Sequence, residues 1–158
     1  MDVAWRASDG QWTYCEVKLS EGEFGAARAD AHHLKKLREI YEPRLRGMFK
    51  SEWLEPHRFF KNYQIFRNIS MLAGDERSRV IFLFPKENER LGEQLEAILD
   101  ATDVTTKARI VIAHVEDVVR LLALDTTLTS TWRDHAKLLE GKYIVAASRS
   151  THGQRIAE

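Results

Sequence analysis

The stretch WTYCEVKLSEGEFG, residues 12–25, begins with residues typical of a β-strand and carries two charges inside it. Glu16 and Lys18 flank Val17, and side chains two residues apart on a strand point to the same face of a sheet. An acid and a base therefore stand side by side on one face. That face would hold Trp12, Tyr14, Glu16 and Lys18. The opposite face is the better candidate for the core, and it would hold Thr13, Cys15, Val17 and Leu19.

A preceding strand brings a second acid, Asp2. Residues 1–7 and 11–19 are expected to form two strands joined by Ser8-Asp9-Gly10, a strong turn signal. A two-residue loop would set Asp2 on the opposite face from Glu16. A three-residue loop would pair Asp2 with Glu16, and it needs a left-handed residue at its third position, where glycine stands. The sequence permits both registers.

Two carboxylates that face each other across a hairpin suit a hard cation. They repel each other unless something positive lies between them. Mg²⁺ is usually held by one or two carboxylates together with phosphate oxygens of the substrate. Lys18, next along the strand, could orient or deprotonate a water and offset charge on a phosphate. The constellation suits metal-assisted phosphodiester hydrolysis; the alternative is that Glu16 and Lys18 are ordinary strand charges in solvent.

An acid followed by Glu16-Val17-Lys18 on the next strand of a hairpin resembles the PD-(D/E)XK nuclease superfamily, which has the restriction-endonuclease-like fold. EVKLSEGEFG, followed later by YQIFRN at residues 63–68, is especially similar to a group of uncharacterised bacterial restriction endonucleases. The resemblance implies a central mixed sheet flanked by helices and a DNA-cleaving site that uses Mg²⁺ (or Mn²⁺).

The resemblance also implies roles for individual residues. Carried over by position, Asp2 and Glu16 would bind the metal, and Lys18 would be the catalytic lysine. Gln64 is the candidate for a glutamine that faces the site from a following helix in some branches. Two features depart from the pattern: Met1 stands where the superfamily has proline, and the N-terminal helix usual in the superfamily would have to precede residue 1. We therefore expect a domain that lacks this helix.

The remaining elements alternate between helices and strands. Continuous apolar runs at residues 79–85 and 108–115 indicate strands buried on both faces. Helices are expected at residues 26–41 (ended by Pro43), 58–73, 89–100, 116–124 and 128–140. The order predicts an α/β protein with a mixed sheet. One nuclease-like domain would span residues 1–147, and residues 148–158 would form a flexible tail.

Charge is balanced overall but unevenly distributed. The chain has 24 Lys and Arg against 24 Asp and Glu, yet residues 28–67 hold ten basic against five acidic side chains. Such a stretch can form a local phosphate-binding surface, although an ordinary solvated helix face is the alternative. The candidate DNA contacts are Lys35, Lys36, Arg38, Arg67 and Asn68.

The single cysteine, Cys15, excludes an internal disulfide and fits a cytoplasmic protein. No apolar run approaches the roughly 20 residues that span a bilayer, so no membrane partner is expected. We therefore expect a metal-dependent nuclease that hydrolyses DNA phosphodiester bonds, in restriction or defence, and we leave a homodimer open. The alternative is a catalytically silent DNA-binding or assembly module that keeps the nuclease fold.

Overall fold

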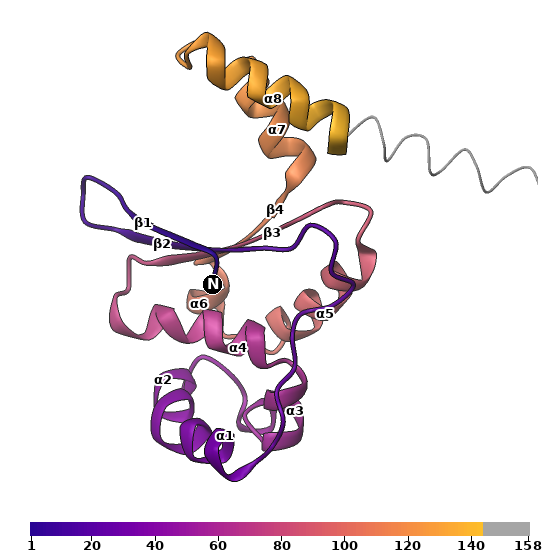
Figure 1. The fold of residues 1–158 in the computed structure, drawn as a ribbon. Coiled ribbons are helices and arrows are strands. Elements are labelled where there is room, and N and C mark those ends of the chain that lie inside the picture. The colour runs from indigo at the N-terminus through magenta and orange to yellow at the C-terminus, as the bar shows by residue number, and fades with distance from the viewer. Residues whose placement is uncertain (144–158) are drawn as a thin grey trace, which may run out of the picture.

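A four-stranded mixed sheet forms the centre of the protein (Figure 1). The structure, a computed structural model, describes residues 1–143. The expected domain boundary at residue 147 and the tail at 148–158 lie outside the described residues. The strands lie side by side in chain order and comprise β1 (Val3–Arg6), β2 (Trp12–Val17), β3 (Arg79–Phe84) and β4 (Ile110–His114). The β1–β2 pair is antiparallel, and the other two pairs are parallel.

The β1–β2 hairpin has the three-residue loop. The Ala7 N–H donates to the Gln11 carbonyl at 2.8 Å, and Gly10 takes a positive φ of 87°. Glycine occupies this left-handed region without the steric cost that a Cβ would impose. The register pairs Val3 with Cys15, and counting on by one residue sets Asp2 across from Glu16. Of the two registers that the sequence permits, the structure has the one that sets Asp2 and Glu16 opposite each other on the two strands.

The first helical region begins and ends later than expected. α1 (Ala31–Lys36) starts where the Asp30 carboxylate caps the His33 N–H at 2.9 Å. It continues through a π-helical turn, Leu37–Tyr41, into α2 (Glu42–Leu45). The expectation that Pro43 ends the helix is wrong, because Pro43 lies in the first turn of α2.

The helix expected at residues 58–73 is divided. α3 (Pro56–Lys61) and α4 (Tyr63–Ile69) meet at Asn62, whose backbone leaves the helical region with φ −117° and ψ 29°. Two short 3₁₀ turns flank this pair of helices. One, Ser51–Trp53, precedes α3, and the other, Ser70–Gly74, follows α4 and ends at the glycine where the helix was expected to stop. The side chain of Asn62 donates to the Arg58 carbonyl at 3.0 Å and so closes α3.

The later helices lie close to their expected positions. They are α5 (Glu89–Leu99), α7 (Val115–Leu124) and α8 (Ser130–Tyr143), the last of which runs past Gly141. A four-residue helix, α6 (Val104–Lys107), was not expected from the sequence, although Asp103 caps it in the usual way. α7 and α8 form a hairpin on the far side of the sheet from α1 to α5 (Figure 1). Within residues 1–143, none of the helices combines the length and apolar character needed to cross a membrane.

The core lies on the face of the sheet that carries Glu16. Phe82 and Phe84 of β3 are buried there against Phe24, Phe66 and the inward side of α5. On the opposite face Thr13 and Cys15 are also buried, but Val17 is half-buried and Leu19 is exposed. The expectation that these four residues line the better core face is therefore wrong. Residues of β3 on that second face, such as Ile81 and Leu83, are only half-buried, so β3 is not fully buried on both faces. Helices α1 to α5 lie on the side of the Tyr14–Glu16 face, and α7 and α8 lie on the other side.

Glycine-to-alanine replacements at two positions should have opposite effects. Gly10→Ala should lower the free energy of unfolding by about 1 kcal/mol, because alanine is strained at a positive φ. Gly92→Ala, within α5 and with open space around the added methyl, should raise it by about 0.5–1 kcal/mol. Urea unfolding measures both; a destabilising Gly92→Ala or a neutral Gly10→Ala would contradict the geometry.

Candidate active site

Glu16 is a carboxylate buried inside the protein, with 1 % of its surface exposed. It lies near the end of β2, and α4 covers it with two side-chain amides. Gln64 Nε2 donates to Oε1, and Asn68 Nδ2 donates to Oε2 at 2.8 Å. Residues four apart on a helix lie on one face, so the two amides reach the carboxylate together. A buried carboxylate needs such partners, because its desolvation is costly.

Three cationic groups surround the same carboxylate. Lys18 Nζ lies 3.6 Å from Oε1, and a guanidinium nitrogen of Arg67 lies 3.8 Å from Oε2. The amino group of Met1 lies 2.7 Å from Oε2. These charges offset the carboxylate where water cannot reach it. Glu16 is thus the centre of a dense polar cluster on an otherwise apolar face.

Lys18 connects this cluster to the loop after β2. It is 9 % exposed, and its Nζ lies between Glu16 and Glu21, 3.5 Å from the latter. The backbone N–H groups of Glu21 and Ser20 lower the pKa of the Glu21 carboxyl, so Glu21 stays ionised. The ammonium group is therefore fixed between two carboxylates, and the residue is almost fully buried.

Asp2 reaches the same strand from β1. Its Oδ2 accepts the Val17 N–H at 2.8 Å, which holds the carboxylate at the end of the hairpin. Asp2 and Glu16 both raise the pKa of the Cys15 thiol, whose pKa is raised most by burial. Their shared electrostatic effect on Cys15 agrees with the register, which brings the two acids to one region.

A family model described as "Restriction Endonuclease associating with ARP" matches residues 1–144. The chain belongs to this family. No curated protein and no solved structure matches it. The family description confirms the expected restriction-endonuclease-like kinship, and the α/β architecture with its flanked mixed sheet is consistent with that fold. The role of the chain is therefore nuclease-related.

A restriction-endonuclease-like protein raises the question of a metal ion. Within residues 1–143, no group of three or more His, Cys, Asp or Glu side chains lies close enough to hold one. Asp2 and Glu16 nevertheless have the donor chemistry that Mg²⁺ takes, because one or two carboxylates suffice when water and phosphate oxygens complete its shell. An ion at Glu16 would share the carboxylate with the amides of Gln64 and Asn68, or displace them. The two carboxylates fit Mg²⁺ in donor type, and an ion there would also have to displace the cationic groups that now face Glu16.

Gly25 holds Gln64 in place, a contact that the sequence analysis missed. The Gly25 N–H donates to Gln64 Oε1 at 2.8 Å, which turns Nε2 of the same amide toward Glu16. A Cβ at position 25 would lie 3.2 Å from that oxygen, so the close approach favours glycine. Gly25 is the last residue of the motif EGEFG, but the sequence does not reveal that its partner is Gln64 on a helix about 40 residues away.

Asn68 and Arg67 occupy different surroundings from those expected of DNA contacts. Asn68 is 1 % exposed and is bonded to Glu16, so its amide lies inside the site rather than on the surface. Arg67 is half-exposed beside it. One helical turn earlier, the Tyr63 hydroxyl lies 2.9 Å from that of Tyr41, and burial raises the pKa of Tyr41 to about 12. The Tyr41 phenol therefore stays protonated at neutral pH.

The remaining candidate DNA contacts lie away from Glu16. Lys35 and Lys36 end α1, and Arg38 follows in the π-helical turn. Lys35 is largely exposed, with Glu39 4.0 Å away. α1 contacts the helices beside the site through the His33 ring, which lies against Phe60 and Tyr63, and through Leu34, which packs on the core. These basic residues belong to the layer below α4 in Figure 1, and the structure does not bring them together with the carboxylates.

The Cys15 thiol should report the charge of Asp2. Asp2→Asn should lower the pKa of Cys15, because it removes one of the negative charges that oppose the thiolate. The pH dependence of alkylation of the folded protein measures this. Asp9→Asn makes the same charge change in the hairpin turn and should leave the Cys15 pKa unchanged. Equal effects of the two variants would show that Asp2 does not act at this site.

Proposed function

We propose that this chain is a nuclease that hydrolyses phosphodiester bonds of DNA, with Mg²⁺ or Mn²⁺ held by Asp2 and Glu16. The observation that carries the proposal is the buried Glu16 carboxylate, with Lys18 beside it and two amides of α4 holding it in place. Membership of a restriction endonuclease family supports the same reaction class.

Each residue has a distinct role in the proposal. The metal ion, when bound, would polarise the phosphate and supply a water of lowered pKa. Asp2 and Glu16 bind it, and Gln64 and Asn68 fix the rotamer of Glu16. Lys18 orients the attacking water or offsets the charge that develops on the phosphate in the transition state. Arg67, half-exposed at the rim, contacts a backbone phosphate.

A silent DNA-binding module is the competing function, and one observation favours it. Both oxygens of Glu16 accept hydrogen bonds from amides in the structure, so the carboxylate is stable without an ion. Incubation of supercoiled plasmid with the purified protein and Mg²⁺ or Mn²⁺ separates the two. Cleavage that EDTA abolishes supports the enzyme; retained DNA binding without cleavage of duplex, single-stranded or RNA substrates supports the module. A homodimer and a cytoplasmic location stay predictions.

Lys18→Met should reduce the cleavage rate by about 10²–10³-fold, the usual cost of removing one transition-state donor. Binding of Mg²⁺ or Mn²⁺, followed by calorimetry, should persist because both carboxylates remain. Lys107→Met is the matched control, since that lysine pairs with Asp100 at the surface near α6. A Lys18→Met protein that cleaves at the parent rate would remove the lysine from the mechanism.

The basic end of α1 should contribute to the salt dependence of DNA binding. Replacing Lys35, Lys36 and Arg38 by alanine should make the slope of log affinity against log salt shallower by about 2–3, because fewer counterions are released. Replacing Arg120, Arg133 and Lys137 removes the same charge from the α7–α8 hairpin and should leave the slope unchanged. Fluorescence anisotropy of a labelled duplex measures it. An unchanged slope in the α1 variant would exclude α1 from the interface.

A further inference from the structure

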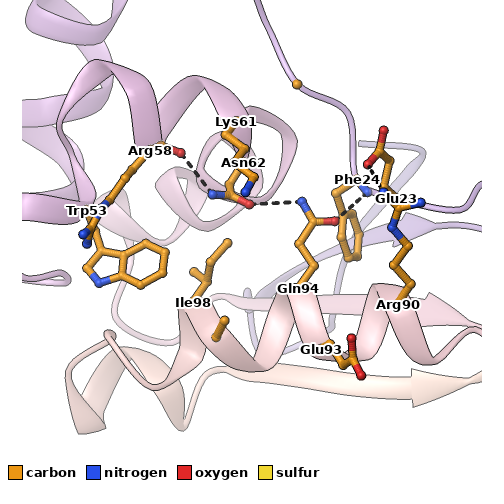
Figure 2. Close-up of a pocket in the computed structure, with 12 residues that line it drawn as sticks. Glu23, Phe24, Trp53, Arg58, Lys61, Asn62, Arg90, Glu93, Gln94 and Ile98 are labelled. Carbon is orange, nitrogen blue, oxygen red and sulfur yellow. Dashed lines mark hydrogen bonds and ion pairs between the residues drawn. The ribbon is translucent and has the colours of Figure 1, made fainter.

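A cavity of about 800 Å³ lies between α3, α5 and the loop after β2 (Figure 2). Its volume is within the range of pockets that bind small molecules. Trp53 and Arg58 lie on one side, and Glu23 and Arg90 lie on the other, with Asn62 and Gln94 between them. None of these residues belongs to the Glu16 cluster, so the cavity needs its own explanation.

The floor and one wall of the cavity are apolar and partly aromatic. Phe24 and Ile98 are almost fully buried, and Trp53 is half-buried beside them. The guanidinium carbon of Arg58 lies 5.3 Å from the centre of the Trp53 ring. An indole and a guanidinium plane are the surfaces on which nucleobases stack.

Three basic side chains at the rim of the cavity, Arg58, Lys61 and Arg90, could bind an anion. Among residues 1–143, no carboxylate lies within ion-pair distance of Arg58 or Lys61, and both are exposed. Arg90 pairs with Glu23 at 3.1 Å, but both side chains are largely exposed, and such pairs exchange readily. With Glu93 also at the rim, three cations face two carboxylates.

Two amides at the back of the cavity have hydrogen-bonding capacity to spare. Gln94 Nε2 donates to Asn62 Oδ1 at 3.0 Å, and Asn62 Nδ2 donates to the Arg58 carbonyl. Each amide nitrogen carries two hydrogens and uses one in these bonds. Asn62 is 8 % exposed, so the pair is rigid. Fixed donors of this kind can recognise the edge of a base.

The same loop joins the cavity to the Glu16 cluster. The Phe24 N–H donates to Gln94 Oε1 at 3.0 Å, and the next residue, Gly25, donates to Gln64, which bonds Glu16. Neighbouring peptide groups therefore contact the cavity on one side and the cluster on the other. One short segment of the loop, Phe24 and Gly25, is therefore shared by the cavity and the Glu16 cluster.

We propose that this cavity binds a nucleoside monophosphate unit. The base lies against Trp53, Phe24 and Ile98, its edge meets the Asn62–Gln94 pair, and its phosphate binds Lys61 and Arg58. The occupant is a nucleotide of the DNA strand that flanks the cleaved bond, or a free nucleotide of the same chemistry. In the first case the inference rests on the proposed nuclease function.

Calorimetric titration without divalent metal tests the site with two probes, dAMP and inorganic phosphate. We expect dAMP to bind more tightly than phosphate. Trp53→Leu should weaken dAMP binding roughly tenfold, the loss of one base–aromatic stack, and leave phosphate binding unchanged. Arg58→Gln with Lys61→Gln should weaken both probes. The control pair Arg133→Gln with Lys137→Gln on α8 should change neither.

A 5′-phosphorylated single-stranded oligonucleotide identifies the source of the nucleotide. If the cavity serves the DNA strand, the oligonucleotide binds more tightly than dAMP and displaces it; if it serves a free nucleotide, dAMP stays bound. Lys61→Gln alone, at an exposed position, replaces the double variant if that variant fails to fold. The inference is overturned if dAMP binds no better than phosphate, or if neither the tryptophan nor the cation variants change dAMP binding.

The nuclease proposal and the cavity can fail separately. Lys18→Met, which removes the proposed catalytic lysine, should bind dAMP as the parent does. If the parent cleaves no nucleic acid yet binds dAMP in a Trp53-dependent manner, the nuclease function fails and the cavity stands. If the parent cleaves DNA and the cavity variants bind dAMP as the parent does, the cavity proposal fails and the nuclease function stands.

Discussion

The burial of the Glu16 carboxylate constrains the rest of the structure. An ion with 1 % exposure on the core face of a sheet has to be compensated by hydrogen bonds and charge. α4 supplies two amides at helical spacing, Lys18 and Arg67 supply charge, and Gly25 fixes the rotamer of Gln64. The position of the loop after β2 and the orientation of α4 therefore follow from a single acidic side chain.

The hairpin was the most predictable part of the fold. The turn Ser8-Asp9-Gly10 and the alternating strand pattern anticipated β1 and β2, and Gly10 selects the register that the sequence left open. The assignment of faces was wrong because Cys15 and Val17 make the opposite face look more apolar than the face that holds Tyr14 and Glu16. The core face is the one against which apolar side chains of distant segments pack, such as Phe24, Phe66 and Leu95, and local patterning carries no information about those partners.

The helical segments show the same limit. The cap at Asp30 and the break at Asn62 depend on residues close by in the chain. Periodicity alone nevertheless started the first helix too early and merged α3 with α4. Asn68 shows how burial bears on a residue's expected role. The sequence placed it among the candidate DNA contacts, whereas in the structure its amide is buried and donates to Glu16. Solvent exposure, which one sequence does not reveal, separates the two roles.

The parallel pairing of β2 with β3 has a consequence for the order of folding. These neighbours in the sheet are separated by about 60 residues of chain, so their pairing closes a long loop, and that closure costs more entropy than closure of the short β1–β2 turn. Contacts between such distant segments form slowly. The hairpin can therefore form early, while Glu16 is still hydrated and the edge of β2 is open. Because α4 lies within the crossover to β3, the carboxylate loses its water only when residues about 50 positions away in the chain pack over it, so the site assembles after the hairpin.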